Sequence, residues 1–266
     1  MLIRRLNTNV LVQVAVIALW LAVAQIVVWL LKLSAPHITY LYTPLEVLQS
    51  APSCIRGGVF QALFSTAVRT LSGFGLAAII GIVTGVAMGR MSWLNCLLRP
   101  AVDLMRPLPS SALIPILVMV IGPDKEATYQ FAIVFGGVWP ILLSALEGTS
   151  LVHKTSGGVM RQLSLTTMEN MRWFVLPEAA HEIMTGMRIS VSVCLILAVT
   201  AEIIVGHQTG LGAYIKDAAG AGNLKESYLA TFLIAILGLL LNGAFRLLEI
   251  RLPWLVNRDE VPVENV

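Results

Sequence analysis

Apolar residues gather in long runs along this chain, and short polar segments separate the runs. Four runs are close to the roughly 20 residues that a membrane-spanning helix needs. They are residues 10–31, 71–88, 131–146 and 189–206. A fifth run covers about 227–248, and a sixth, less regular, covers about 97–121. The pattern predicts an all-α polytopic membrane protein of about six transmembrane helices, in one transmembrane domain over residues 1–266.

The composition supports this prediction. Hydrophobic residues make up 57% of the 266 residues, charged residues only 12%, and the mean hydropathy is +0.81. A soluble domain of average composition is far less apolar. The first run follows two arginines and contains an Ala-Val-Ala sequence at 22–24 that resembles a signal-peptide cleavage site. Because the run continues to Leu31, it is too long for the apolar part of a signal peptide, and we expect it to be retained as an anchor.

The distribution of lysine and arginine predicts the orientation, because cytoplasmic loops carry an excess of both. With the N-terminus inside, the cytoplasmic side receives Arg4, Arg5, Arg90, Arg99, Arg106, Lys154, Arg161, Arg172, Arg188, Arg246, Arg251 and Arg258. The outer side receives Lys32, Arg56, Arg69, Lys125, Lys216 and Lys225. We therefore expect both termini, a loop at about 149–184 and a tail at about 251–266 to be cytoplasmic. This asymmetry accounts for the net charge of +3 without a nucleic-acid partner.

The second span has a small residue at every fourth position: Gly73, Ala77, Gly81, Gly85 and Gly89. On a helix these residues form one smooth ridge against which another helix can pack closely. The ridge predicts an interior helix, with simple close packing and functional rocking both open as its purpose.

The third span contains the segment RPLPSSALIP, with three prolines around Ser110 and Ser111. Proline opposes a continuous helix, and broken backbone at membrane depth belongs where it is covered by protein or lines a water-filled cavity. The segment predicts either a broken helix beside a transport pathway or a proline-rich helix entry at the inner surface.

Glu202 is the only carboxylate well inside an apolar run. Counting from Arg188 places it about 21 Å along a helix, near the outer boundary. This position favours a partly solvated structural carboxylate over a gate or a proton relay. No basic residue is deep enough to predict an anion site. Weak candidates for polar side chains along a pathway are Thr66, Thr70, Thr84, Ser110, Ser111, Gln130, Ser192, Thr200 and Glu202.

The polar loop before residue 177 has helical features of its own. Thr166 and Glu169 have the spacing of a capping box, which predicts a short helix that begins at Thr166 and stops before Pro177. The loop also has an apolar stripe at roughly helical spacing, made of Met160, Leu163, Met168, Met171 and Val175. Such a stripe can lie on the membrane surface or fit a groove in another protein. From Pro177 onward the sequence predicts a new helix with proline in its first turn.

Several blocks of the sequence resemble a known family in that family's order: TAVRTLSGFGLAAIIGIVTGVAMGR, RPLPSSALIP, FVLPEAAHEIMTGMRIS, TAEIIVG and TGLGAYI. The chain resembles the inner-membrane permease subunits of bacterial binding-protein-dependent ABC importers, in the branch that carries nitrate, bicarbonate, taurine and other sulfonates. The resemblance covers nearly the whole length. It implies the transmembrane domain of a type I ABC importer, located in the bacterial inner membrane, with a pathway for a small polar or anionic solute.

In that family the cytoplasmic loop after the fourth span carries a coupling motif, Glu-Ala-Ala, three residues, Gly, nine residues, Ile-x-Leu-Pro. Alignment on Leu176-Pro177 places the Glu-Ala-Ala on residues 158–160 and the glycine on Ser164, so the literal Glu-Ala-Ala at 178–180 is a coincidence. The absent Glu and Gly bear on coupling strength or on the choice of ATPase. The residues that the resemblance assigns to ATPase coupling are Gly158, Val159, Met160, Arg161, Leu163, Ser164, Thr166, Glu169, Leu176 and Pro177.

The sequence contains no G-x-x-x-x-G-K-[ST] motif, so it does not predict a phosphate-binding loop in this chain. The resemblance implies a cytoplasmic ABC ATPase dimer that binds ATP and Mg²⁺. It also implies a second permease copy, in a homodimer or a heterodimer, and a periplasmic or lipid-anchored substrate-binding protein. We expect a non-catalytic subunit without a catalytic residue, metal or cofactor of its own. A proton-coupled secondary transporter using Glu202 and an intramembrane hydrolase are the alternatives.

Overall fold

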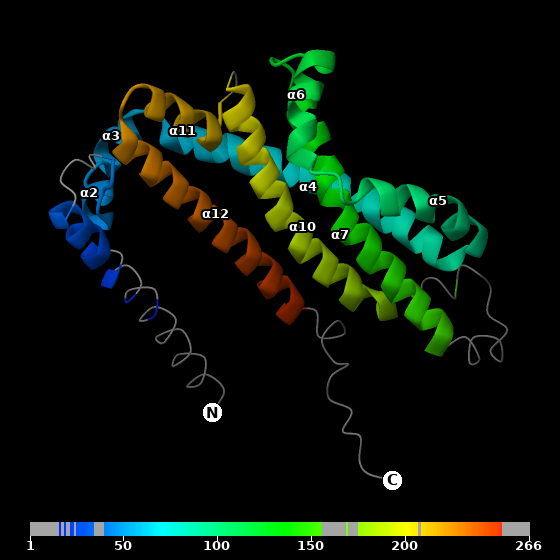
Figure 1. The fold of residues 1–266 in the computed structure, drawn as a ribbon. Coiled ribbons are helices and arrows are strands. Elements are labelled where there is room, and N and C mark those ends of the chain that lie inside the picture. The colour runs from blue at the N-terminus through cyan, green and yellow to red at the C-terminus, as the bar shows by residue number, and fades with distance from the viewer. Residues whose placement is uncertain are drawn as a thin grey trace, which may run out of the picture. The chain divides into compact units, whose positions relative to one another are not determined.

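The computed structural model describes residues 16, 19, 22–23, 25–34, 40–155, 169, 175–206 and 209–251 (Figure 1). Every regular element among these residues is a helix, which confirms the predicted all-α class. The helices are α2 (Pro44–Leu48), α3 (Ala51–Arg56), α4 (Val59–Arg90), α5 (Ser92–Met105), α6 (Ser110–Ile121), α7 (Glu126–Thr155), α10 (Leu176–Val205), α11 (Leu211–Gly220) and α12 (Leu224–Arg251). A shorter apolar helix covers Gln25–Ser34.

Four helices of the described part are long and apolar enough to cross a membrane: Val59–Arg90, Glu126–Ser150, Ala179–Val205 and Leu224–Leu248. All four lie where apolar runs predicted spans. The helices begin earlier or end later than the runs, because each helix continues past its apolar centre into polar turns. Half of the run at 10–31 lies outside the described residues.

The proline-rich third span is broken, which agrees with the first of its two predicted forms. Helix α5 ends at Met105, α6 begins at Ser110, and the two meet at an angle of 90°, so they count as a fifth span only if taken together. Pro109 caps α6 with extended backbone. At 1.5 Å per residue the 12 residues of α6 extend about 18 Å, well short of the roughly 30 Å of a bilayer core.

The small-residue ridge of α4 packs directly on α7. A Cβ added at Gly81 would lie 2.9 Å from the Ile141 side chain, and one added at Gly89 would lie 2.7 Å from that of Thr149. A Cβ at Gly85 would meet the Leu142 carbonyl oxygen and the Ala145 side chain. The two helices therefore touch backbone to backbone, and the predicted interior position of α4 is confirmed at this face.

Helix α7 is also closely packed on its other side, where α10 runs along it (Figure 1). A Cβ at Gly186 of α10 would lie 2.6 Å from Ser144, and one at Gly148 of α7 would lie 3.2 Å from the Ala179 carbonyl oxygen. One buried hydrophobic cluster lies along these helix contacts. It contains Ile133 and Ile141 of α7 together with Val191 of α10. Helix α7 is thus the central helix, with α4 and α10 fixed against it.

The chain divides into two compact units, Met1–Phe60 with Tyr214–Phe232, and Gln61–Ala213 with Leu233–Val266. In the first unit, Thr43 and Glu46 form a reciprocal capping box at the start of α2. The Lys32 ammonium donates to both Glu46 oxygens, at 2.9 and 2.7 Å. Lys32 and Lys225 both lie near the face of the Tyr42 ring, at 5.7 and 5.3 Å from its centre. One domain over the whole chain stays a prediction.

Glu46 gives the first unit a stability that depends on pH. The hydrogen bond from Lys32, followed by that from the Thr43 backbone N–H, lowers the pKa of Glu46 below its usual 4.5. A lowered pKa adds stability that is present above about pH 4.5 and is lost as the pH falls through the folded-state value. Glu46→Gln should therefore lower stability at pH 7 by less than about 1 kcal/mol, as for a partly exposed ion pair. Amide hydrogen exchange of α2 at pH 7 and pH 4 measures this, and a difference from wild type that does not shrink at pH 4 would contradict it.

Candidate functional site

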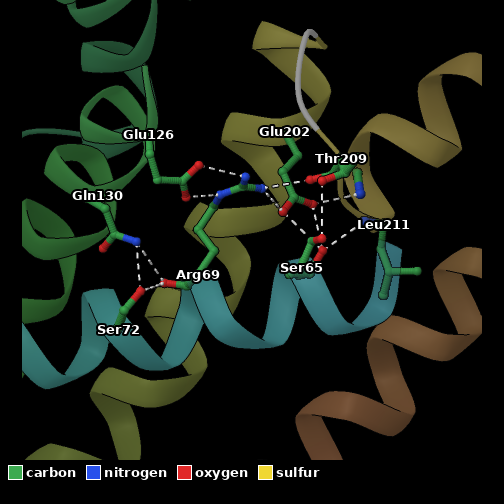
Figure 2. A network of polar contacts seen from close by, with 10 residues as sticks. Ser65, Arg69, Ser72, Glu126, Gln130, Glu202, Thr209 and Leu211 are labelled. Atoms are coloured by element: carbon green, nitrogen blue, oxygen red, sulfur yellow. Dashed lines mark hydrogen bonds and ion pairs between the residues drawn. The ribbon is translucent and has the colours of Figure 1, made fainter. Parts of the chain in front are cut away.

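Arg69 of α4 is the centre of a polar network in the second unit (Figure 2). Its Nη1 lies 2.5 Å from Glu202 Oε1 of α10. Its Nε and Nη2 lie 2.6 and 2.9 Å from the two oxygens of Glu126, in the first turn of α7. Nη1 also donates to the Thr209 carbonyl oxygen at 3.1 Å. One guanidinium therefore joins three helices and the segment that follows α10.

Glu202 is buried, which corrects the prediction of a partly solvated carboxylate. The residue is 1% exposed. The Thr66 hydroxyl donates to it, with distances of 3.0 and 2.9 Å to its two oxygens, and the Gly212 backbone N–H donates at 2.9 Å. Glu202 does lie in the last turn of α10, as its place in the sequence indicated. Residues 209–212, which we call the strap, contact the carboxylate and help to bury it.

Two residues of the strap, Gly210 and Gly212, are glycines because Glu202 leaves no room for a side chain at either position. Gly206 ends α10 with a left-handed backbone, at a φ of 69°. A side chain at Gly210 would collide with the Glu202 carboxylate, and a Cβ at Gly212 would lie 2.7 Å from Glu202 Cβ. The Leu211 backbone N–H donates to the Thr66 hydroxyl at 2.8 Å, so side chains from other helices satisfy the first N–H groups of α11. The sequences TAEIIVG and TGLG therefore form one site.

Arg69 is the residue that the sequence analysis missed. Its positive charge placed it among the residues of the outer side, and no basic residue was expected to be deep enough for an anion site. In the structure Arg69 lies ten residues into α4, and its side chain is 5% exposed and paired with two carboxylates. One signal in the sequence could have indicated that Arg69 is buried. Arg69 lies inside the block TAVRTLSGFG, directly before the glycine ridge of an interior helix.

Four of the pathway candidates belong to this network or lie next to it. Besides Thr66 and Glu202, these are Thr70, which follows Arg69 in α4, and Gln130, whose amide nitrogen donates to Ser72 Oγ at 2.8 Å. The Tyr129 ring lies 4.3 Å from the guanidinium. Thr70 Oγ1, Tyr129 OH and Gln130 Oε1 are buried side-chain atoms without a hydrogen-bond partner among the described residues.

The other pathway candidates lie elsewhere. Ser110 packs against Gly136 at the start of α6, and Ser111 beside it is exposed. Ser192 forms a hydrogen bond with Asn242 of α12, and Thr200 donates to the Ile196 carbonyl oxygen of its own helix. Thr84 likewise donates to the Ile80 carbonyl oxygen of its own helix. These contacts bind neighbouring helices or turns and do not bring the five residues together.

Most of the predicted coupling segment lies outside the described residues, namely Gly158, Val159, Met160, Arg161, Leu163, Ser164 and Thr166. Glu169 is helical and exposed. Helix α10 begins at Leu176 with Pro177 in its first turn, which confirms the helix predicted from Pro177 onward. Pro177 is exposed, whereas Val175 just before it is buried. Within the described part, no three residues among His, Cys, Asp and Glu are grouped as a metal site would need.

Comparison with known proteins places the chain among transport proteins. The sequence pattern of a family described as "Binding-protein-dependent transport system inner membrane component" matches residues 77–252. The chain is 32% identical over 195 residues to the bicarbonate transport system permease protein CmpB of Synechococcus elongatus, covering 72% of this chain and 70% of that protein. It is 28% identical over 234 residues to the nitrate import permease protein NrtB of Synechocystis, covering 84% of each. Over 199 residues it is 30% identical to the taurine transport system permease protein TauC of Escherichia coli, covering 74% and 71%.

A solved structure shares the fold. The inward-facing MetNI methionine ABC transporter contains a chain that superimposes with a TM-score of 0.65 at 17% identity, covering 74% of this chain and 97% of that one. This likeness confirms the predicted fold of a type I ABC importer transmembrane domain. The chain therefore belongs to the inner membrane components of binding-protein-dependent transport systems, the permease subunits of ABC importers.

Proposed function

We propose that this chain forms the transmembrane pathway for a small polar or anionic solute, such as a sulfonate, nitrate or bicarbonate. The observation that carries the proposal is its identity of about 30% to bicarbonate, nitrate and taurine permeases over at least 70% of both chains. A cytoplasmic ABC ATPase dimer that binds ATP and Mg²⁺ drives transport in this proposal. A second permease copy, identical or divergent, completes the pathway, and a periplasmic or lipid-anchored protein delivers the solute. Both termini are cytoplasmic.

Coupling to the ATPase is assigned to the segment before Pro177. Its apolar stripe suits a groove in a partner protein. Because α10 begins at Leu176 and packs along α7, a displacement of this segment would be transmitted to the contact between α7 and α10. ATP-driven closure of the ATPase dimer would pull two such segments together and switch the pathway from inward-open to outward-open.

A charged substitution in the coupling segment tests this assignment. Leu163→Asp should reduce solute uptake by the reconstituted complex at least about tenfold, while ATP hydrolysis continues. The reason is that a charge removes the apolar contact with the ATPase groove, and about 1.4 kcal/mol of lost coupling is a tenfold change. Uptake into proteoliposomes and phosphate release are measured together. Leu163→Met, which keeps the volume and apolar character, is the matched control and should retain uptake.

The result that would refute the coupling assignment is full uptake by Leu163→Asp. A detergent pull-down of the chain from its native membrane tests the proposed function more broadly. Co-purification of a P-loop ATPase in stoichiometric amount is expected. Solute movement by the chain alone, in vesicles without ATP, would overturn the importer assignment in favour of a proton-coupled transporter.

A further inference from the structure

We propose that the Nε/Nη2 edge of Arg69 is a binding site for a small oxyanion, and that Glu126 occupies it as an exchangeable internal anion. The inference rests on the proposed function, since it gives the anionic solute a site in this chain. The two Glu126 oxygens lie 2.6 and 2.9 Å from Nε and Nη2, as a fork-to-fork pair (Figure 2). A sulfonate, nitrate or bicarbonate presents two oxygens that suit the same fork.

The two carboxylates on Arg69 are not equivalent. Glu202 has a side-chain exposure of 0%, and it is also held by Thr66 and by the strap. Glu126 has a side-chain exposure of 51%, and both of its hydrogen bonds to described residues go to Arg69. A side chain in the first turn of a helix, half in water, can rotate outward without disturbing the packing around it. Glu126 is therefore the partner that can leave, and Glu202 is the fixed counter-ion.

Charge makes the exchange selective for anions. Arg69 and Glu202 together are neutral, and Glu126 adds one negative charge. An oxyanion of charge −1 in place of Glu126 keeps the same net charge. A cation or a neutral solute instead leaves the Nε/Nη2 edge of the buried Arg69 guanidinium without an anion. An unpaired buried charge is strongly unfavourable. Release of Glu126 from Arg69 is thus coupled to the arrival of another anion.

Unpartnered polar atoms on residues close to Arg69 and Glu126 along α4 and α7 are a further observation that fits a polar guest. Glu126, Tyr129 and Gln130 are spaced i, i+3 and i+4 on α7 and share one face. Tyr129 OH and Gln130 Oε1 are buried without a partner among the described residues, as is Thr70 Oγ1 on α4. Tyr129 and Thr70 are both 0% exposed. Buried polar groups are nearly always hydrogen-bonded, so three such atoms on residues close to Arg69 and Glu126 along α4 and α7 leave hydrogen-bonding capacity for a polar ligand or its hydration water.

The test is an anion titration of the purified complex of this chain with its partners. Sodium nitrate, methanesulfonate and bicarbonate are added at constant ionic strength against sodium chloride, and the melting temperature is followed. In Glu126→Ala the fork is vacant, so each oxyanion should stabilise the complex saturably, with an apparent affinity at least about tenfold higher than in wild type. Glu126→Gln, which keeps the shape but offers only one acceptor oxygen, should give an intermediate gain.

A second substitution shows whether the fork itself recognises the anion. Arg69→Lys in the Glu126→Ala background keeps the positive charge but removes the paired Nε and Nη2 donors. It should therefore abolish the higher oxyanion affinity of Glu126→Ala. The inference is overturned if Glu126→Ala and Glu126→Gln both titrate like wild type, or if Arg69→Lys retains the gain. Uptake by wild type is measured separately. If wild type takes up the solute with ATP but Glu126→Ala shows no saturable response to the oxyanions, only this inference is overturned. If Glu126→Ala shows that response but wild type has no ATP-driven uptake, only the proposed function is overturned.

Discussion

Glu202→Ala is expected to lower the free energy of unfolding by about 3–5 kcal/mol, the range for breaking one partner of a buried ion pair. The substitution leaves the Arg69 Nη1 group buried without its carboxylate, and it removes the acceptor of both Thr66 and the Gly212 N–H. The strap would lose its attachment to α10 at the same time. Thermal denaturation of the detergent-solubilised complex, with the fraction folded followed by size-exclusion chromatography, measures the loss.

The matched variant removes both charges. Arg69→Met with Glu202→Met replaces the pair by apolar side chains of similar length, so no buried charge is left alone. Glu126, half in water, tolerates the loss of its partner. The double variant should therefore be more stable than either single one, which is the non-additivity expected of residues in contact. Two single effects that are small and simply add would show that the pair is not the tight contact seen in Figure 2.

The spans were predictable from the sequence because each needs only local information. A run of about 20 apolar residues indicates a helix whatever its neighbours are. The break at residues 106–109 was equally local, since the prolines themselves oppose a helix. The helix ends were less predictable: α4 begins at Val59, where the residues are not continuously apolar, and Thr66 in its second turn hydrogen-bonds to Glu202 and Leu211, far along the chain.

The Arg69 site could not be predicted in the same way because its members are far apart in the sequence. Arg69 and Glu202 are separated by 133 positions, and the burial of both depends on how α4, α7 and α10 meet. Glu202 alone indicated that a partner was needed, since a carboxylate in an apolar run is normally paired. Arg69 was assigned to the outer side because counting charges gives the side of a residue but not its depth.

The contact between α4 and α7 depends on Gly85 more than on helix propensity. Alanine is the better helix former by about 0.5–1 kcal/mol, yet Gly85→Ala should destabilise the protein by about 1–3 kcal/mol, as overpacking does. Its Cβ would lie 2.7 Å from the Ala145 side chain and would also meet the Leu142 carbonyl oxygen, which is backbone and cannot turn aside. Thermal denaturation of the solubilised protein measures the loss.

Gly75 provides the control on the same helix, because a Cβ added there has no heavy atom within 4 Å. Gly75→Ala gains helix propensity without a collision, so it should be neutral or slightly stabilising. The two substitutions are chemically identical, and a difference of opposite sign isolates the contact with α7 from the backbone effect of removing a glycine. Equal effects at the two positions would mean that α4 and α7 are not in backbone contact. Since α7 also packs along α10, a shift forced by Gly85→Ala should reduce uptake as well as stability.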